Sequence, residues 1–251
     1  MAERETLRIA AVGDLHVRKT SLGTLQPLFA KATESADVIL LCGDLTDYGT
    51  PDEARVLAKE ITTSLRIPVI AVLGNHDFES NNEKELVQIL ADVGVVVLDG
   101  DSHEIHGVGF AGVKGFVGGF GRRQLGAWGE KIIKDFVHTA IEEALKLEAA
   151  LARLRTPQKI GVLHYSPIHA TVEGEPEEII PFLGSSRLEE PLDRYRATAV
   201  FHGHAHRGQL EGRTKGNAPV YNVAMPLLQA RFPDQPPLRI VEIPVGQPAL
   251  T

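Results

Sequence analysis

Gly74-Asn75-His76-Asp77 is the stretch of sequence that decides the fold of this chain and the place of its site. It directly follows the apolar run Val69–Leu73, at the point where a glycine ends a short strand pattern. About 30 residues separate successive strand ends of this kind, the length of one strand–helix–strand unit. Ligands of open α/β sheets bind outside the carboxyl ends of the strands, so we expect the polar strand ends to converge there. The two earlier ends are Gly13-Asp14, after Leu7–Val12, and Gly43-Asp44, after Val38–Cys42.

The first part of the chain, up to Gly94, alternates strand and helix patterns. Helices are expected over about 22–35, from Pro51 onward, and from Asn82 to about Asp92. Such alternation favours a mostly parallel sheet with helices on both faces.

The pattern changes after Gly94. Three short apolar runs follow, which are typical of an antiparallel meander rather than of crossover units, at 95–98, 102–106 and 108–113. Two final apolar runs are expected to close a second sheet, at 220–223 and 239–245.

A glycine-rich loop and a long helix separate the two halves. The loop, 112–123, contains Arg122 and Arg123, and its glycine spacing is not that of a nucleotide-binding loop. It is interpreted either as a linker or as a flap from which an arginine reaches a phosphate. The helix, 129–155, repeats apolar residues at spacings of three and four, and we expect it to pack on the chain's own sheet, with a homodimer interface as the alternative. We interpret residues 1–251 as one domain in which about 112–155 is inserted.

Composition restricts the class of protein. The chain has 251 residues, 43% hydrophobic and 24% charged, which is ordinary for a globular protein, and no run approaches the roughly 18 apolar residues of a membrane span. The N-terminal residues lack the apolar core of a signal peptide, and the single cysteine, Cys42, lies in an apolar run, so a cytoplasmic location is expected. The net charge of −7 disfavours binding to long nucleic acids but does not exclude a nuclease, because two bound divalent ions would add about four positive charges.

Seven side chains at strand ends form a candidate metal site. They comprise two carboxylates, one amide and four imidazoles without a thiolate, a set that suits Mn²⁺ or Fe, with Zn²⁺ as a further choice, and argues against a structural zinc site. Seven ligands are too many for one ion but suffice for two if Asp44, on the middle strand of the three, bridges them. A pair of ions roughly 3.5–4 Å apart can clamp the attacking and leaving oxygens of a phosphoryl transfer. The seven are Asp14, His16, Asp44, Asn75, His164, His204 and His206.

These residues also resemble the signature of a known family. The blocks Asp14-x-His16, Gly43-Asp44, Gly74–Asp77, His164 and Gly203–His206 are similar to the five-block pattern of the calcineurin-like metallophosphoesterases. The resemblance implies a four-layer α/β/β/α sandwich of two mixed sheets flanked by helices, with two metals at the sheet edge. It implies one metal bound by Asp14, His16, Asp44 and His206, and a second bound by Asp44, Asn75, His164 and His204.

The same resemblance gives catalytic roles to two further residues. His76 corresponds to a histidine that binds no metal and lies near the leaving-group oxygen as proton donor or charge stabiliser, and Asp77 would support it. The chain departs from the family pattern after His164 and at Arg207, where a glycine is frequent. Candidate substrate-binding residues are Arg122, Arg123, Arg207 and the additional imidazole His202.

The predicted function is a binuclear metal-dependent phosphodiesterase that hydrolyses a small phosphate ester by attack of a metal-bridging hydroxide. A nuclease is the first alternative, but it predicts a basic groove, and the four acids in 173–178 would repel a polyanion if they face the site. A non-catalytic interaction scaffold on the same fold is the second. Loss of the catalytic histidine marks such scaffolds, and His76 is present here.

Overall fold

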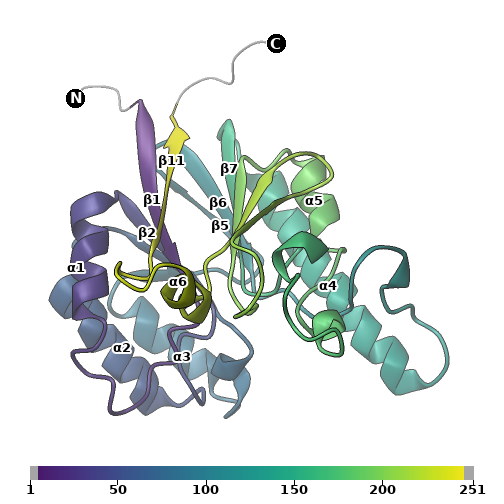
Figure 1. Cartoon of the computed structure of the whole chain (residues 1–251), viewed down its shortest axis with the longest axis horizontal. Helices are drawn as coiled ribbons and strands as arrows, with labels where there is room; N and C mark the ends of the chain where they lie inside the picture. The colour runs from purple at the N-terminus through teal and green to yellow at the C-terminus, as the bar shows by residue number, and fades with distance from the viewer. Residues whose placement is uncertain (1–4, 246–251) are drawn as a thin grey trace.

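The computed structural model describes residues 5–245 and arranges them in two β-sheets that pack face to face, with helices on both outer sides (Figure 1). The first sheet has the strand order β11-β1-β2-β3-β4, and the second has the order β5-β6-β7-β8-β10-β9. The predicted four-layer sandwich of two mixed sheets is therefore confirmed.

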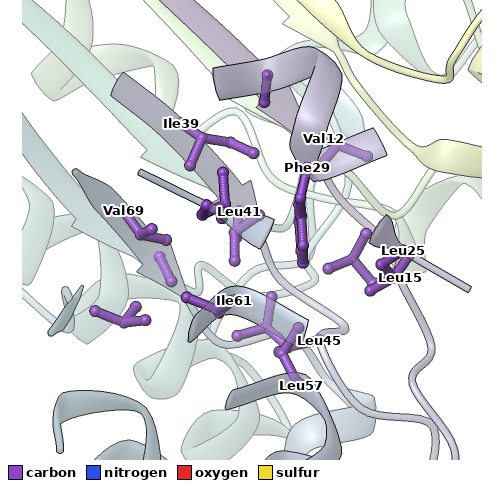
Figure 2. Close-up of a cluster of buried hydrophobic side chains, with 14 of the residues drawn as sticks. Val12, Leu15, Leu25, Phe29, Ile39, Leu41, Leu45, Leu57, Ile61 and Val69 are labelled. Carbon is purple, nitrogen blue, oxygen red and sulfur yellow. The ribbon is translucent and has the colours of Figure 1, made fainter. Parts of the chain in front are cut away.

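The first sheet contains the strands that carry the first half of the site. Four of its strands run parallel, namely β1 (Thr6–Val12), β2 (Val38–Cys42), β3 (Val69–Val72) and β4 (Val95–Val97). The predicted connecting helices are present: α1 (Gln26–Ser35), α2 (Pro51–Ser64) and α3 (Glu83–Ala91). They cover only the outer face, whereas the alternating pattern favoured helices on both faces, because the inner face packs against the second sheet. Figure 2 shows the core between these layers, where Phe29 of α1 and Leu57 of α2 pack with Ile39 and Leu41 of β2.

Alternation of side chains along the strands builds a second core between the two sheets. In β1, Ala10 and Val12 face the helices, whereas Leu7, Ile9 and Ala11 face the second sheet. The second sheet contributes large apolar side chains to this inner core, including Phe110, Val162 and Phe201. Because β1 and β2 are apolar on both faces, they can only occupy an interior layer.

The second sheet has its own helical cover. Its strands are β5 (Asp101–Ile105), β6 (Val108–Val113), β7 (Gln158–Leu163), β8 (Ala199–His202), β9 (Glu211–Arg213) and β10 (Pro219–Asn222). The helices α4 (Lys131–Arg153) and α5 (Glu189–Arg194) cover its outer face, and α4 packs Leu147 and Leu151 against it, as expected for the long helix. No helix within residues 5–245 combines the length and the apolar character needed to cross a lipid bilayer.

Two strand predictions are wrong. The run at 95–98 does not begin an antiparallel meander, because β4 pairs parallel with β3 at the edge of the first sheet. The run at 239–245 does not close the second sheet, because β11 (Arg239–Pro244) pairs antiparallel with β1, opposite Leu7 and Ile9. This pairing follows the helix α6 (Met225–Arg231) and covers the free edge of β1, which would otherwise leave backbone groups unpaired. A local apolar pattern does not encode which edge a strand will join.

Phe110→Ala tests the inner core. The Phe110 side chain is fully buried between the sheets, so its truncation should lower the free energy of unfolding by about 3–5 kcal/mol, measured by urea denaturation. Leu22→Ala, an exposed position before α1, is the control and should change stability by less than about 0.5 kcal/mol. Equal effects of the two substitutions would contradict the two-sheet packing.

Candidate metal centre

The seven predicted ligands follow strands whose carboxyl ends lie at one edge of the two sheets. Those strands are β1, β2 and β3 of the first sheet and β7 and β8 of the second, and neighbours among them are parallel. The loops after β1 and β2 stay side by side beyond the strands, since the N–H of His16 donates to the carbonyl of Asp44 at 3.0 Å. The structure brings the seven side chains together at this edge in two groups.

The first group is formed by Asp14, His16 and His206, whose ligand atoms lie within 4.8 Å of one another. Nε2 of His206 is 3.0 Å from Oδ1 of Asp14. Nδ1 of His16 is 3.2 Å from Oδ1 of Asp47, while Nε2 on the other side of the ring is 3.8 Å from Oδ2 of Asp44. The His16 ring therefore turns Nε2 toward the interior of the site.

The second group is formed by Asp44, His164 and His204, again within 4.8 Å. Nε2 of His164 lies 3.4 Å from Oδ1 of Asp44 and 2.9 Å from Oδ1 of Asn75. The rings of His164 and His204 are neighbours, with centroids 4.8 Å apart. Asn75 thus belongs to the same side of the site as these two histidines.

Asp44 lies between the two groups. Its Oδ2 faces His16 of the first group and its Oδ1 faces His164 of the second. The carboxylate is almost completely buried, so both oxygens are directed into the site rather than toward solvent.

Three observations fit divalent cations at this place. Nε2 of His16 is buried and makes no hydrogen bond with any described residue. Nδ1 of His164 must donate to the carbonyl of Cys42, 3.0 Å away, so in the neutral ring Nε2 and the Asn75 oxygen are two acceptors facing each other at 2.9 Å. Ligand atoms on one ion, with bonds of about 2.0–2.2 Å, stand roughly 3 Å apart, so a cation accounts for this separation. Within residues 5–245, no lysine or arginine pairs with the buried Asp14 or Asp44.

The protonation states largely suit ligands. Burial opposes ionisation of Asp14, but the hydrogen bond from His206 and the charge of His164 outweigh it and lower the pKa of Asp14 to about 2. Burial lowers the pKa of His204 to about 3 and also lowers the pKa of His16. The hydrogen bond to Asp14 raises the pKa of His206, which favours the protonated ring, and metal binding requires that ring to be neutral.

The ligand loops have unusual backbone conformations. Asp14, His16, Asp44 and His204 have φ angles of 58°, 44°, 47° and 71°, in the left-handed region that non-glycine residues rarely adopt. Strain of this kind persists where the surrounding structure enforces it and is concentrated at functional sites. Here it turns carboxylates and imidazoles inward at the first residues after each strand.

Two glycines permit close approach to the ligands. A Cβ on Gly74 would lie 2.2 Å from the Asp44 nitrogen, and a Cβ on Gly203 would lie 2.3 Å from Oδ2 of Asp14. No side chain fits at either position unless the neighbouring carboxylate moves. The glycines of the sequence blocks therefore make room for the ligands themselves.

His76 lies at the border of the centre in a short 3₁₀ turn, η1 (His76–Phe78). Its backbone N–H donates to Oδ1 of Asp44 at 2.8 Å, and its ring Nδ1 donates to the carbonyl of Asp47 at 2.8 Å. The other ring nitrogen, Nε2, lies 4.0 Å from Oδ2 of Asp44. Burial opposes protonation, but the Asp47 carbonyl and the charge of Asp44 outweigh it and raise the pKa of His76. The ring can therefore hold a proton at Nε2 beside the centre.

The carboxylate of Asp77 contacts backbone rather than the ring of His76. It is fully buried and accepts hydrogen bonds from the N–H groups of Leu45, Thr46 and Gly74 at 3.1, 2.8 and 2.8 Å. Burial and the nearby charge of Asp44 raise the pKa of Asp77 to about 6. Asp77 thus ties the loop after β2 to the loop after β3 and positions Asp44 and His76 indirectly.

The four candidate substrate-binding residues lie in different places. Arg207 lines a cleft of about 280 Å³ together with Asp44, His76 and His204. Arg122 lines a different hollow with Glu189 and Lys215, and neighbouring Arg123 is exposed in the same short turn. His202 is fully buried, and its two nitrogens bond to Gly203 and Thr171.

The glycine-rich loop is tied to a neighbouring segment of the second half. The N–H groups of Gly118 and Gly119 donate to the carbonyls of Pro181 and Gly184 at 3.0 and 2.9 Å. Phe120 of the loop packs against Leu183, and Leu183 lines the metal cleft. The loop therefore packs against a residue of the cleft wall without lining the cleft itself. This placement differs from a free linker.

Sequence reasoning missed Asp47. Its carboxylate contacts Nδ1 of His16, and its carbonyl accepts the Nδ1 proton of His76, so one residue orients both rings. Arg18 holds the same carboxylate at 2.7 Å. The available signal was the second aspartate, three positions after Asp44 in the same loop.

Comparison with known sequences identifies a family. A family model described as calcineurin-like phosphoesterase matches residues 7–208, which contain the seven predicted ligands and His76. The curated protein "Probable glycerophosphodiester phosphodiesterase GpdQ" of Arcobacter nitrofigilis is 26% identical over 186 residues. The match covers 68% of this chain and 57% of that relative, so the chain spans little more than half of the relative's length.

Two solved structures share the fold. Phosphopantetheinyl hydrolase from Mycobacterium tuberculosis superposes with a TM-score of 0.66 at 18% identity, covering 93% of this chain and 95% of that one. The protein TT1561 of Thermus thermophilus superposes with a TM-score of 0.57 at 17% identity, covering 96% of this chain and 100% of that one. At these identities the similarity establishes the architecture alone.

Gly203→Ala tests the packing of the centre. The new methyl group would displace the Asp14 carboxylate, so the affinity for Mn²⁺ should fall by about tenfold or more, measured by calorimetric titration of metal-free protein. Gly126→Ala is the matched control, because a Cβ there meets nothing closer than 3.4 Å. Unchanged affinity in Gly203→Ala would show that Asp14 is not a ligand in this geometry.

Proposed function

The chain belongs to the calcineurin-like phosphoesterase family, and from that premise we propose that it is a binuclear metal-dependent phosphodiesterase acting on a small phosphate ester. The observation that carries the proposal is the position of Asp44, with one oxygen toward each of two ligand groups. A single-ion site would leave one of those groups without a function.

Each side chain has a distinct task in this proposal. Divalent ions, when bound, would supply Lewis acidity to the phosphoryl oxygens and lower the pKa of an attacking water to about 7. Donor chemistry without sulfur favours Mn²⁺ or Fe, with Zn²⁺ as a further choice. One ion would be held by Asp14, His16 and His206, and the other by Asn75, His164 and His204, with Asp44 shared.

His76 would donate a proton to the leaving alkoxide. Its Nδ1 proton is held by the Asp47 carbonyl, so the proton that it can transfer is the one on Nε2. The raised pKa keeps more of the ring in the protonated form that a general acid needs. Asp47 and Asp77 would act as positioning residues. Asp47 would orient the ring of His76 through its carbonyl. Asp77 would hold together the loop after β2 and the loop after β3, which contains His76.

A small ester fits the cleft better than a long polyanion. The cleft measures about 280 Å³, slightly below the range of roughly 300–1,000 Å³ for small-molecule sites. Glu175 lines it together with His76, and its carboxylate accepts the backbone N–H of Arg207. The name of the curated relative supports a diester over a monoester. A nuclease would need to bind a polyanion beside Glu175.

The non-catalytic scaffold predicts no turnover with metals bound, and the retained His76 argues against it.

A homodimer through 130–155 is a further proposal, supported by Ile132 and Leu145 on the exposed side of α4, and sedimentation velocity measures it. A cytoplasmic location stays a prediction.

A hydrolysis panel with added Mn²⁺ tests the proposal. The protein should hydrolyse bis-p-nitrophenyl phosphate faster than p-nitrophenyl phosphate. Cyclic mononucleotides are included as small natural diesters. Single-stranded DNA should be a poor substrate. A chelator should abolish the activity, and restored Mn²⁺ should recover it. Turnover of none of these substrates, with two metals per chain found by elemental analysis, would favour the scaffold, and preference for DNA would favour the nuclease.

His76→Ala tests the proton donor. Loss of general-acid help should lower kcat by about 10²–10⁴-fold on a diester with a poor alkyl leaving group, and by much less on a nitrophenyl ester, whose leaving group needs no proton. His138→Ala, on the exposed side of α4, is the control. Metal content should stay unchanged, and full activity of His76→Ala on the alkyl ester would remove His76 from the mechanism.

A further inference from the structure

A second cavity lies beside the metal centre along the same sheet edge. It measures about 460 Å³, within the range of small-molecule sites, and shares no lining residue with the metal cleft. Its walls include Leu73 at the end of β3, Leu98 after β4 and Lys114 after β6. These strands are parallel to the ligand-bearing strands next to them, so the cavity opens at the edge where the ligands gather.

Two residues that line this cavity are joined to the reacting groups. Phe78, on one wall, is the third residue of the turn that begins with His76. Lys114, which also lines the cavity, accepts at its carbonyl the N–H of His164 and that of Tyr165, at 3.1 and 3.0 Å. The Tyr165 ring in turn packs edge-on against the ring of His204, with centroids 4.5 Å apart.

The ammonium of Lys114 is held by aromatic rings. It lies 5.3, 5.0 and 5.2 Å from the ring centroids of Phe78, Phe116 and Tyr165, within cation–π range. Its one hydrogen-bond acceptor among the described residues is the carbonyl of Gly115, at 2.9 Å. An ammonium has three donors, so the two that have no oxygen acceptor among the described residues can exchange a contact with a ring for an oxygen inside the cavity.

Four other charged residues line the cavity, namely Glu83, Lys84, Asp99 and Asp101, and the last two form ion pairs with residues outside it. Asp99 binds Lys146 at 3.0 Å, and Asp101 lies 3.6 Å from Arg153. The remaining wall is mainly apolar, with Val87 of α3 and Val97 of β4 beside Leu98. The cavity therefore combines an apolar surface with a positively charged donor on the side nearest the metal ligands.

We propose that this cavity is the subsite for the organic group of the phosphate ester, an apolar or aromatic group that carries an acidic or carbonyl oxygen for Lys114. The inference rests on the proposed function, because the phosphate must be held at the metal centre while its organic group reaches past Phe78. It adds a substrate class, namely esters of bulky, partly apolar alcohols rather than of small polyols.

Binding of three phosphonates to the Mn²⁺-loaded protein, measured by calorimetry, tests the subsite without requiring turnover. Methylphosphonate occupies the metal centre alone, phenylphosphonate adds an apolar group, and 4-carboxyphenylphosphonate adds an oxygen anion for Lys114. We expect phenylphosphonate to bind about tenfold or more tightly than methylphosphonate, because burial of a ring removes apolar surface from water. The carboxylate should strengthen binding further.

Two variants separate the contributions. Val87→Trp should fill the cavity and abolish the gain from the phenyl ring while leaving methylphosphonate binding unchanged. Lys114→Met should retain the gain from the ring and lose the gain from the carboxylate, and Lys134→Met, on exposed α4, is its control. Thermal unfolding shows whether each variant is folded, and a misfolded Val87→Trp leaves the Lys114→Met comparison decisive.

Equal affinity of wild-type protein for methyl- and phenylphosphonate would overturn the inference, as would a Lys114→Met variant that keeps the whole carboxylate gain. Neither result affects the proposed function, whose failure appears as absent hydrolysis across the substrate panel. The two ideas can therefore fail separately.

Discussion

Two buried carboxylates whose neighbours are imidazoles are the constraint on which this structure depends. Asp14 and Asp44 lie at the ends of adjacent apolar strands, almost completely removed from water. Burial of a carboxylate is costly unless the charge is paired, and within residues 5–245 the surrounding partners are imidazoles rather than lysine or arginine. Divalent cations would meet that need, so a feature that is costly to the metal-free fold is also the one suited to metal chemistry.

That constraint determines the local structure around it. Four of the seven candidate ligands have left-handed backbone angles, and Gly74 and Gly203 lie so close to Asp44 and Asp14 that a methyl group does not fit. Loop conformations of this kind need support from outside the loops. Asp77 provides part of it through hydrogen bonds to three backbone N–H groups, and the sheets provide the rest, because neighbouring strands fix where each loop begins.

Local chemistry in the sequence identified side chains that the structure brings together at one sheet edge, whereas long-range strand pairing was predicted poorly. Apolar runs that end in glycine and a polar residue revealed β1, β2 and β3, and a parallel sheet then required their ends to meet. The partner of β11 could not be deduced, because an apolar strand fits equally well on either sheet until the free edge of β1 is known. The role of Asp47 could not be predicted from the sequence, because it too depends on contacts between separate segments. Its role arises from a carbonyl and a carboxylate that face two different rings, which is a property of three-dimensional placement.

The same distinction separates the reaction from the substrate. The groups at the metal centre are short side chains on residues directly after strands, so the core itself fixes their positions, and the reaction class follows from few residues. The groups that would hold the rest of an ester come from α3, from the segment after β4 and from Lys114, which belong to different sheets and connections. Changes in those connections would alter the cavity without disturbing Asp44 or His76. Selectivity can therefore diverge among chains that share this centre, which is why the walls beside Phe78 carry more information about the substrate than the ligands do.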